Sequence, residues 1–357
     1  MRVLHVDAGR EWRGGQNQVR LLLRELARDP AIDVRLVSNR DGELARRLAP
    51  GVPISGATWS IGLDPRAWWT IRRALRSFRP DLIHVHDSHA LTLCRWTGTT
   101  IPLIAHRRVD FHVRSGSSWF SAQRIVAVSE AVRRVLLADG VPSGIVTVIP
   151  DGIDPAEIRA NAARPMDIRS RLSLPGHTPL ALNAAALVGH KDQITLIRAA
   201  AEARARAPQL HWMIAGEGER RPALAAEIAR AGLGDRVHLL GYVTEIDSLI
   251  READVFVMSS KEEGLGSVIL HALALGKPVV STAAGGIPEI LAADALVPIA
   301  DHTALAQRVV DMIAHPVATS LPDRFTAKSM ARATLGLYRS SASTSLHQPP
   351  QPPTASY

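Results

Sequence analysis

The stretch of sequence that decides the fold is EGLGSVILHALALGKPVV, residues 263–280. A glutamate stands before a glycine turn, and nine mostly apolar residues follow. A glycine and a proline then end the run before a short β-branched segment. This order indicates a helix that leads into a buried strand. The same alternation of helix and strand recurs along the chain. The stretch can therefore be an ordinary packed unit, or it can form the floor of a ligand site.

The polar residues of this stretch favour a ligand site. If a helix starts near Gly266, its first N–H groups are unpaired and can bind a phosphate. Glu263 would repel that phosphate unless it faces elsewhere, and its carboxylate is better suited to sugar hydroxyls. Ser267 and His271 are four residues apart, so they share one face of the helix, which we expect to face a cleft. The alternative is a buried helix with one hydrogen-bonded histidine.

Short apolar runs alternate with longer amphipathic ones on both sides of this stretch. Strands are expected at residues 3–6, 34–38, 81–86, 102–107, 124–129 and 145–150, and again at 180–186, 211–218, 236–243, 255–259 and 278–282. Helices are expected between them, among them residues 16–28, 42–49, 67–78 and 130–140. Strands separated by helices imply parallel sheets covered on both faces. Two such series imply an α/β chain with two doubly wound domains facing across a cleft.

The domain boundaries follow from composition. Residues 1–152 form the first domain, and the turn-rich DGIDP at 151–155 is a natural hinge. Residues 153–325 form the second domain, and residues 326–340 read as a last helix. The proline- and serine-rich residues 341–357 are expected to be disordered.

Size and composition narrow the class of protein. The chain has 357 residues and is 46% hydrophobic, which favours two domains of ordinary size. A single cysteine, Cys94, excludes an internal disulfide framework and is typical of a reducing compartment. No apolar run is long enough to span a bilayer, and the N-terminal MRVLHVDAGR reads as a strand rather than a signal peptide. We therefore expect a cytoplasmic protein.

The excess positive charge lies in the first half of the chain. Residues 1–150 contain 22 Arg, no Lys and 13 Asp plus Glu, a balance of +9, whereas the remainder has a balance of −1. This half also holds six of the seven tryptophans, including the pair Trp68-Trp69. Such a domain suits an anionic membrane surface or a polyanionic acceptor, and peripheral attachment to the inner face of the cytoplasmic membrane is one interpretation. Simple solubility is the other, and a nucleic-acid partner is not favoured.

Polar residues gather where strands of the first domain end. Gly14 and Gly15 lie between the first strand and the first helix, where backbone N–H groups can approach an anion. HVHDSHA (84–90) and AHRRVDFH (105–112) follow two later strands, and they supply candidates for binding an acceptor and stabilising developing charge. These candidates are His86, Asp87, His106, Arg107, Arg108 and Asp110.

Two alternatives compete for these residues. Surface arginines beside a packed histidine would explain them without any function. A metal site at His84, His86 and His89 is less favoured, because no second well-spaced group of ligands accompanies it, and we expect no metal.

In the second domain, Lys191 falls just before a helix, where a cation can face a bound phosphate.

Together these motifs resemble the family 4 glycosyltransferases, retaining enzymes of the GT-B fold, over about residues 1–340. The resemblance rests on the order and spacing of GG after the first strand, VIPDGID, LVGHKDQITLIRA, AGEGER, LLGYVTEIDSLIREADVFVMSS and SSKEEGLGSVILHALALGKPVVSTAAGGIPEIL. With HVHDSHA and AHRRVDF, the first domain looks most like that of bacterial members that build lipopolysaccharide and other surface glycans.

The resemblance implies a role for each matching residue. Lys191 would contact the diphosphate of a UDP- or GDP-linked sugar, Glu263 the sugar hydroxyls, and His106 would lie near the reacting carbon; these three are the catalytic candidates. The other donor contacts would come from Gly14, Gly15, Gly241, Tyr242, Val243, Gly264, Leu265, Gly266, Ser267 and His271. Members of the family use no metal, so no cofactor is expected, and the last helix would cross back onto the first domain.

Two positions depart from the family pattern. The second glutamate of the E-x7-E motif, which usually binds the ribose, is His271 here. The arginine five residues before the lysine is Ala186. Each loss can cost about 1–3 kcal/mol of binding, unless Arg107 or Arg108 compensates.

The sequence thus predicts a glycosyltransferase that moves a sugar from a nucleotide-sugar to a glycan or lipid-linked acceptor, with retention, in lipopolysaccharide or other surface-glycan synthesis. The two departures favour an alternative, a degenerate GT-B protein that binds a glycan or a partner transferase without catalysis. A nucleotide-sugar epimerase, which shares the fold, is a further alternative.

Overall fold

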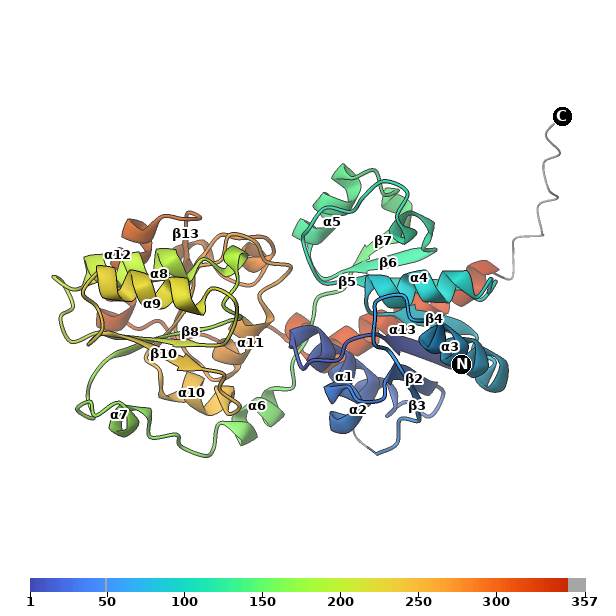
Figure 1. Ribbon diagram of the computed structural model, residues 1–357, viewed down its shortest axis with the longest axis horizontal. Coiled ribbons are helices and arrows are strands. Elements are labelled where there is room, and N and C mark those ends of the chain that lie inside the picture. The colour runs from blue at the N-terminus through green and yellow to red at the C-terminus, as the bar shows by residue number, and fades with distance from the viewer. Residues whose placement is uncertain (49, 346–357) are drawn as a thin grey trace.

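The computed structural model describes residues 1–48 and 50–345 and consists of two lobes, each built on its own parallel sheet (Figure 1). The predicted C-terminal disorder therefore lies mostly outside the described residues. The last helix, expected to end at residue 340, continues to Ser345.

The first lobe contains a seven-stranded sheet in the order β3-β2-β1-β4-β5-β6-β7. Its strands are β1 Arg2–Asp7, β2 Asp33–Asn39, β3 Ile54–Ala57, β4 Leu82–Val85, β5 Leu103–Arg107, β6 Arg124–Ala127 and β7 Val146–Val148. Its helices are α1 Gly14–Leu26, α2 Glu43–Arg47, α3 Pro65–Phe78, α4 Ser88–Trp96 and α5 Glu130–Ala138. Apolar side chains alternate along the strands, so that one face packs on α3 and α4 and the other on α1 and α13 (Ala327–Ser345).

The second lobe contains a six-stranded sheet in the order β10-β9-β8-β11-β12-β13. Its strands are β8 Leu180–Ala184, β9 His211–Ala215, β10 Val237–Gly241, β11 Val255–Met258, β12 Val279–Thr282 and β13 Leu296–Val297. Its helices are α6 Pro155–Asn161, α7 Ile168–Arg171, α8 Gln193–Ala203, α9 Arg221–Arg230, α10 Ile246–Glu252, α11 Ser267–Ala274 and α12 His302–Ala314. Short 3-10 turns span Ser118–Ser121, Ser143–Ile145, Gly189–Lys191, Ile287–Glu289, Ala293–Ala295 and Asp323–Phe325.

Both sheets reverse their strand order once, as doubly wound sheets do, so the predicted fold class is confirmed. The sequence did not predict the edge strands β3 and β13 or helix α4. β3 reads ISGA and β13 has two residues, which are too short for a visible period of alternation. Ladder hydrogen bonds to β2 and β12, rather than local propensity, define these two strands.

Two crossings of the chain join the lobes, and they lie side by side. Ile153 forms a parallel bridge with Thr326, through N–H bonds from Ile153 to Phe325 O (2.9 Å) and from Ala327 to Ile153 O (2.8 Å). After the second crossing, α13 packs against α1 on the first lobe (Figure 1). Arg24 of α1 bridges to Asp154 (2.8 Å) and to Glu157 of α6 (2.5 Å) beside this hinge.

Gly152 is required for the close contact of the two crossings. A Cβ at this position would lie 2.3 Å from the carbonyl oxygen of Thr326, which is backbone and cannot rotate away. We expect Gly152→Ala to lower the free energy of unfolding by about 1–3 kcal/mol, the usual cost of overpacking, as measured by urea denaturation. Gly144→Ala is the matched control, because a Cβ there has no neighbour within 4 Å. Equal stability of the two variants would contradict this account of the hinge.

Candidate functional site

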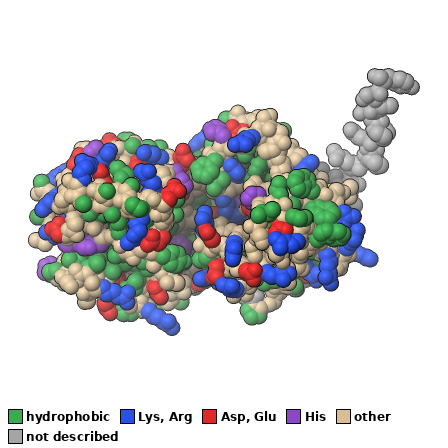
Figure 2. All heavy atoms as spheres, viewed as in Figure 1, with side chains coloured by type: hydrophobic (Ala, Val, Ile, Leu, Met, Phe, Trp, Pro, Cys, Tyr) green, Lys and Arg blue, Asp and Glu red, His purple; other side chains and the backbone are tan. Residues whose placement is uncertain are grey.

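The two sheets direct the carboxyl ends of their strands toward the boundary between the lobes, where the molecular surface is hollowed (Figure 2). In doubly wound sheets ligands bind at the point where the strand order reverses. Here these points lie between β1 and β4 in the first lobe and between β8 and β11 in the second. The loops after these strands carry most of the residues that the sequence predicts to be functional.

Helix α11 begins at Ser267, directly after Gly266, as the opening stretch of sequence predicts. Gly266 has a φ of 87°, a left-handed conformation that favours glycine, and no side chain caps the helix. The Ser267 hydroxyl donates to Asp151 at 3.3 Å, so this turn faces the hinge of the first lobe. An uncapped helix N-terminus at a domain boundary can bind an anion.

Lys191 and Glu263 form an ion pair in the second lobe. Lys191 Nζ lies 2.5 Å from Glu263 Oε1, which also accepts a hydrogen bond from the Ser260 hydroxyl at 2.9 Å. The side chains of the lysine and the glutamate are only 18% and 8% exposed. The pair joins the loop after β8 to the loop after β11, and it turns the glutamate toward the lysine.

Gly264 and its neighbours bring the lobes into direct contact. A Cβ at Gly264 would lie 2.0 Å from the carbonyl oxygen of Arg108 in the first lobe. The hydroxyl of Ser129 donates to Gly264 O at 2.6 Å, and Glu289 accepts the first N–H groups of α5 at 2.9 and 3.0 Å. These contacts hold the cleft closed on one side.

Arg108 lies at the centre of this boundary. Its guanidinium contacts Asp151 (3.2 Å) and donates to His106 Nδ1 (3.2 Å), and its Cδ lies 4.0 Å from the position of a Cβ on Gly15. Arg107 faces the other side of the sheet, where it stacks on Trp119 and donates to a backbone carbonyl. Of the two arginines considered as compensation for Ala186, only Arg108 therefore lies among the predicted donor residues.

His106 is buried, and burial together with the neighbouring Arg108 lowers its pKa well below the usual value. Its imidazole is therefore neutral. Because Nδ1 accepts from Arg108, the proton is on Nε2, which has no partner among the described residues. Because Nε2 is buried, His106 acts on the cleft through Arg108 rather than by direct contact with a ligand.

His271 forms a pair with a carboxylate that the sequence did not single out. Its Nδ1 lies 2.7 Å from Asp247 Oδ1, and Asp247 Oδ2 accepts from Asn161 at 2.9 Å. The histidine and aspartate line a pocket of about 300 Å³ that also includes Trp12 and Arg47 of the first lobe. The pocket thus spans both lobes at the position of the departure from E-x7-E.

The Asp247 contact changes what a glutamate at position 271 would do. We expect His271→Glu to weaken UDP or GDP binding about fivefold, because two carboxylates would then share one pocket wall. His271→Glu combined with Asp247→Asn removes this repulsion, and we expect its affinity to equal or exceed that of the wild type. Calorimetry with both nucleotides measures this. Tighter binding by the single variant would show that Asp247 does not act on position 271.

Other predicted residues are spread along the same boundary. Gly241 ends β10 with a φ of 74°, and Tyr242 beside it is exposed. Gly14 opens α1, and Leu265 is buried next to Gly266. Val243 is partly buried, and these donor roles stay predictions.

The acceptor-side candidates differ in their burial and in how many of their polar atoms already have hydrogen-bond partners. Both carboxylate oxygens of Asp87 accept backbone N–H groups, one from Ala8 (2.7 Å) and one from the start of α4. Asp87 is therefore positioned to hold a loop and cap a helix. Asp110 is half-buried in the loop after β5, where the rings of Phe111 and His190 meet in a T-shaped arrangement across the boundary. His86 is buried among other histidines.

Three functional candidates were missed in the sequence. Asp151 was treated as part of a turn, Asp247 as part of a helix, and Asp7 as the first residue of the loop after the first strand. Burial and the nearby Asp87 raise the pKa of Asp7 to about 7. Each is an aspartate at a strand end or helix start, where capping is the ordinary role, so no sequence signal separated them from capping residues.

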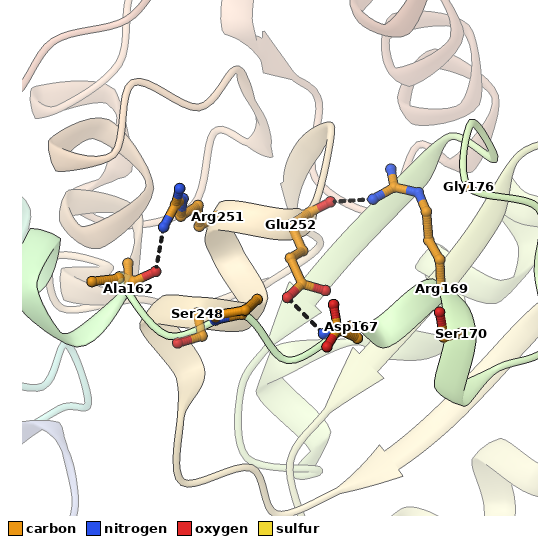
Figure 3. Close-up of a pocket in the computed structure, with 10 residues that line it drawn as sticks. Ala162, Asp167, Arg169, Ser170, Gly176, Ser248, Arg251 and Glu252 are labelled. Carbon is orange, nitrogen blue, oxygen red and sulfur yellow. Dashed lines mark hydrogen bonds between the residues drawn. The ribbon is translucent and has the colours of Figure 1, made fainter.

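A second pocket, of about 620 Å³, lies on the second lobe between the α6–α7 segment and α10 (Figure 3). The polar side chains that line it hydrogen-bond to neighbouring parts of the protein. Glu252 accepts N–H groups from Met166, Asp167 (2.9 Å) and Ile168 (2.7 Å), which caps α7. Arg251 and Arg169 donate to backbone carbonyls. These polar groups bind one another, and none was predicted from the sequence to be functional.

The chain matches two family models. Residues 12–157 match the model described as Glycosyltransferase Family 4, and residues 178–315 match the model described as Glycosyl transferases group 1. The lipopolysaccharide core biosynthesis glycosyltransferase LpsE of Rhizobium meliloti is 34% identical over 161 residues, 44% of this chain and 46% of LpsE. The 2-deoxystreptamine N-acetyl-D-glucosaminyltransferase of Streptomyces fradiae is 26% identical over 302 residues, 72% of this chain and 70% of that protein.

Solved structures show the same fold. Anabaena HepE in complex with UDP and glucose has a TM-score of 0.81 and 20% identity, covering 95% of this chain and 100% of that one. The lipopolysaccharide outer core galactosyltransferase WaaB has a TM-score of 0.71 and 13% identity, covering 95% and 99%. Several relatives, LpsE included, are matched over only about half their length. The two family models together span most of the chain, which therefore consists of a glycosyltransferase family 4 domain followed by a glycosyl transferases group 1 domain.

Proposed function

We propose that this protein transfers a sugar from a nucleotide-sugar to a glycan or lipid-linked acceptor, with retention at the anomeric carbon and without a metal at the cleft. The observation that carries the proposal is the convergence of Lys191, Arg108 and the uncapped start of α11 on one boundary between lobes. This arrangement supplies two cations and a helix N-terminus to a leaving diphosphate. Relatives named as glycosyltransferases and a neighbour solved with UDP and glucose support it.

In this mechanism the sugar lies between the lobes. Lys191 and the N–H groups at the start of α11 stabilise the charge that develops on the diphosphate, where fixed donors are worth most. Glu263, held by Lys191 and Ser260, orients the sugar hydroxyls. Through its Nδ1, His106 holds the guanidinium of Arg108 beside the diphosphate, where the negative charge of the leaving group develops.

A panel of UDP- and GDP-sugars tests the proposal, with lipid-linked and lipopolysaccharide-core acceptors. Nucleotide release that depends on acceptor, with the product anomer read by NMR, supports retaining transfer. Conversion of the donor into its sugar epimer, without acceptor and without net nucleotide release, would instead indicate an epimerase. Nucleotide or glycan binding with no turnover across the panel would indicate a binding protein.

We further propose that the first lobe meets an anionic membrane surface. A groove of about 940 Å³ at the sheet edge is lined by Arg35, Arg40, Arg73 and Arg76, with Trp69 61% exposed beside them and no acidic residue in the lining. Basic side chains gather over α3 at this end of the molecule (Figure 2). No helix among the described residues has the length and apolar character needed to cross a bilayer.

Vesicle sedimentation checks this surface. We expect binding to phosphatidylglycerol vesicles but not to phosphatidylcholine vesicles, weakening with salt, because each basic residue near the surface contributes about 1 kcal/mol. Arg73→Glu with Arg76→Glu should lower the partition coefficient at least tenfold. Arg204→Glu with Arg206→Glu, the same charge change on exposed residues of the second lobe, should not. If both double variants lose vesicle binding equally, the binding depends on net charge alone and not on this surface.

A further inference from the structure

Four histidines form a buried cluster in the first lobe. His5 is in β1, His84 in β4, His86 just after β4, and His106 in β5. β4 pairs with both β1 and β5, and His5 is the direct partner of His84 in the sheet. Their rings lie close, with centroids 4.4 Å apart for His84 and His86 and 5.3 Å apart for His5 and His86. Tyr338 of α13 closes the cluster, with its hydroxyl 2.5 Å from His84 Nδ1.

Much of the hydrogen-bonding capacity of this cluster is unused. His5 Nδ1 and His86 Nε2 lie 3.0 Å apart, and one hydrogen bond between them satisfies those two atoms. Four buried ring nitrogens have no partner among the described residues: His5 Nε2, His84 Nε2, His86 Nδ1 and His106 Nε2. A buried polar atom without a partner costs about 1–3 kcal/mol. Histidines that only pack against one another leave this free-energy cost uncompensated, whereas a ligand bound by several of the ring nitrogens would offset part of it.

The geometry suits a metal ion. His5, His84 and His86 can each offer one ring nitrogen such that all three nitrogens lie within 4.8 Å of one another. In a tetrahedral zinc site, bonds of about 2.0–2.1 Å place ligand nitrogens roughly 3.3 Å apart. The rings would therefore need to close by about 1.5 Å at most. His89, the third histidine of the sequence motif, is exposed and lies outside this group.

The electrostatics also permit a cation. Burial lowers the pKa of His5 to about 3 and those of His84 and His86 well below the usual value, so the imidazoles are neutral, the form that binds metals. Arg108 is the nearby positive charge that contributes to these shifts. It is paired with Asp151, which limits its repulsion of a second cation.

We propose that His5, His84 and His86 bind one divalent transition metal ion of the zinc type, with a water molecule as the fourth ligand and the Tyr338 hydroxyl holding the His84 ring from the second layer. Three imidazoles suit zinc, cobalt, nickel or copper rather than magnesium or calcium. The ion would join β1 and β4 beneath α13 and stabilise the first lobe. The sequence disfavoured a metal because it showed no second well-spaced group of ligands beside His84, His86 and His89; His5, on another strand, was not considered. The site is structural, takes no part in sugar transfer and stands apart from the proposed function.

Cobalt titration of the tag-free chain tests the site. Apoprotein prepared with a chelator is offered Co²⁺ alone, both when folded and during refolding from urea, because the cluster is buried. We expect about one equivalent to bind, with the intense visible absorption of a tetrahedral site, and Zn²⁺ to displace it and raise the melting temperature. Less than a tenth of an equivalent under both conditions would overturn the proposal.

Variants separate this cluster from surface histidines. His5→Gln and His86→Asn should each abolish the cobalt absorption. Circular dichroism verifies that each variant is folded, and if one folds poorly the other still tests the site. Tyr338→Phe should keep the absorption but bind about 10- to 100-fold more weakly, as loss of an outer-layer contact does. His238→Gln is the matched control, because His211 and His238 also stack, with nitrogens 2.9 Å apart, but offer only two ligands. Absorption that survives both cluster variants, or that is lost in the control, would contradict the assignment.

Discussion

Replacing Lys191 with Met should lower kcat/KM for sugar transfer by about 10²–10³-fold, since a fixed cation at a developing charge is worth about 3–4 kcal/mol. Two effects combine in this variant. The diphosphate loses its cation, and Glu263, only 8% exposed, loses the partner 2.5 Å away and is free to turn toward the anion. Steady-state kinetics with the preferred donor measure the loss.

Two further variants separate these effects. In Lys191→Met with Glu263→Gln, no unpaired buried carboxylate remains, so the free energy of unfolding should recover while kcat/KM does not. Lys261→Met is the matched control. Lys261 is in the loop after β11, two residues before Glu263, and pairs with Asp192 at 3.2 Å, but it is 49% exposed, so kcat/KM should stay within about threefold. Retention of a third or more of wild-type kcat/KM by Lys191→Met would contradict the proposed role.

Gly264→Ala should lower kcat/KM by about 10²-fold for a different reason. The added Cβ would lie 2.0 Å from Arg108 O and 3.5 Å from Val109 Cα, both in the opposite lobe. Because these are backbone atoms, the lobes must shift apart, and a displacement of about 1 Å between reacting groups can cost about 10²-fold in rate. Small-angle scattering should show a larger radius of gyration.

The stability of this variant should change little, because the clash is relieved between lobes rather than inside one. Gly234→Ala, where a Cβ has no neighbour within 4 Å, is the control for both measurements. Unchanged activity and unchanged scattering in Gly264→Ala would show that the contact of Gly264 with Arg108 is not needed for transfer.

The sequence predicted the fold well, and the physical reason is visible in the opening stretch. The glycine turn, apolar run and β-branched segment at 263–280 became the loop after β11, α11 and β12 as expected. Periodicity is a local property, so it survives in a single sequence. Contacts through space do not, and the pairing of Lys191 with Glu263, predicted to contact different parts of one donor, could only come from the structure.

Arg107, the last residue of β5, and Arg108, the residue after it, show where the sequence was ambiguous. Neighbouring side chains at a strand end point in different directions, but nothing in the sequence says which of the two faces the cleft. The same limit hid His5, which reads as one polar residue in a short strand. Only the strand order, with β4 between β1 and β5, brings it to His84.

The return of α13 to the first lobe also affects how the protein is made. Met330, Leu337 and Tyr338 fill the same apolar cluster as Val3 and Leu22, although more than 300 residues separate them in the chain. During translation the first lobe therefore leaves the ribosome with the part of this apolar face that α13 covers still exposed, and it stays exposed while the whole second lobe is synthesised. The lobe that is made first is completed last, and until then its exposed apolar surface favours aggregation.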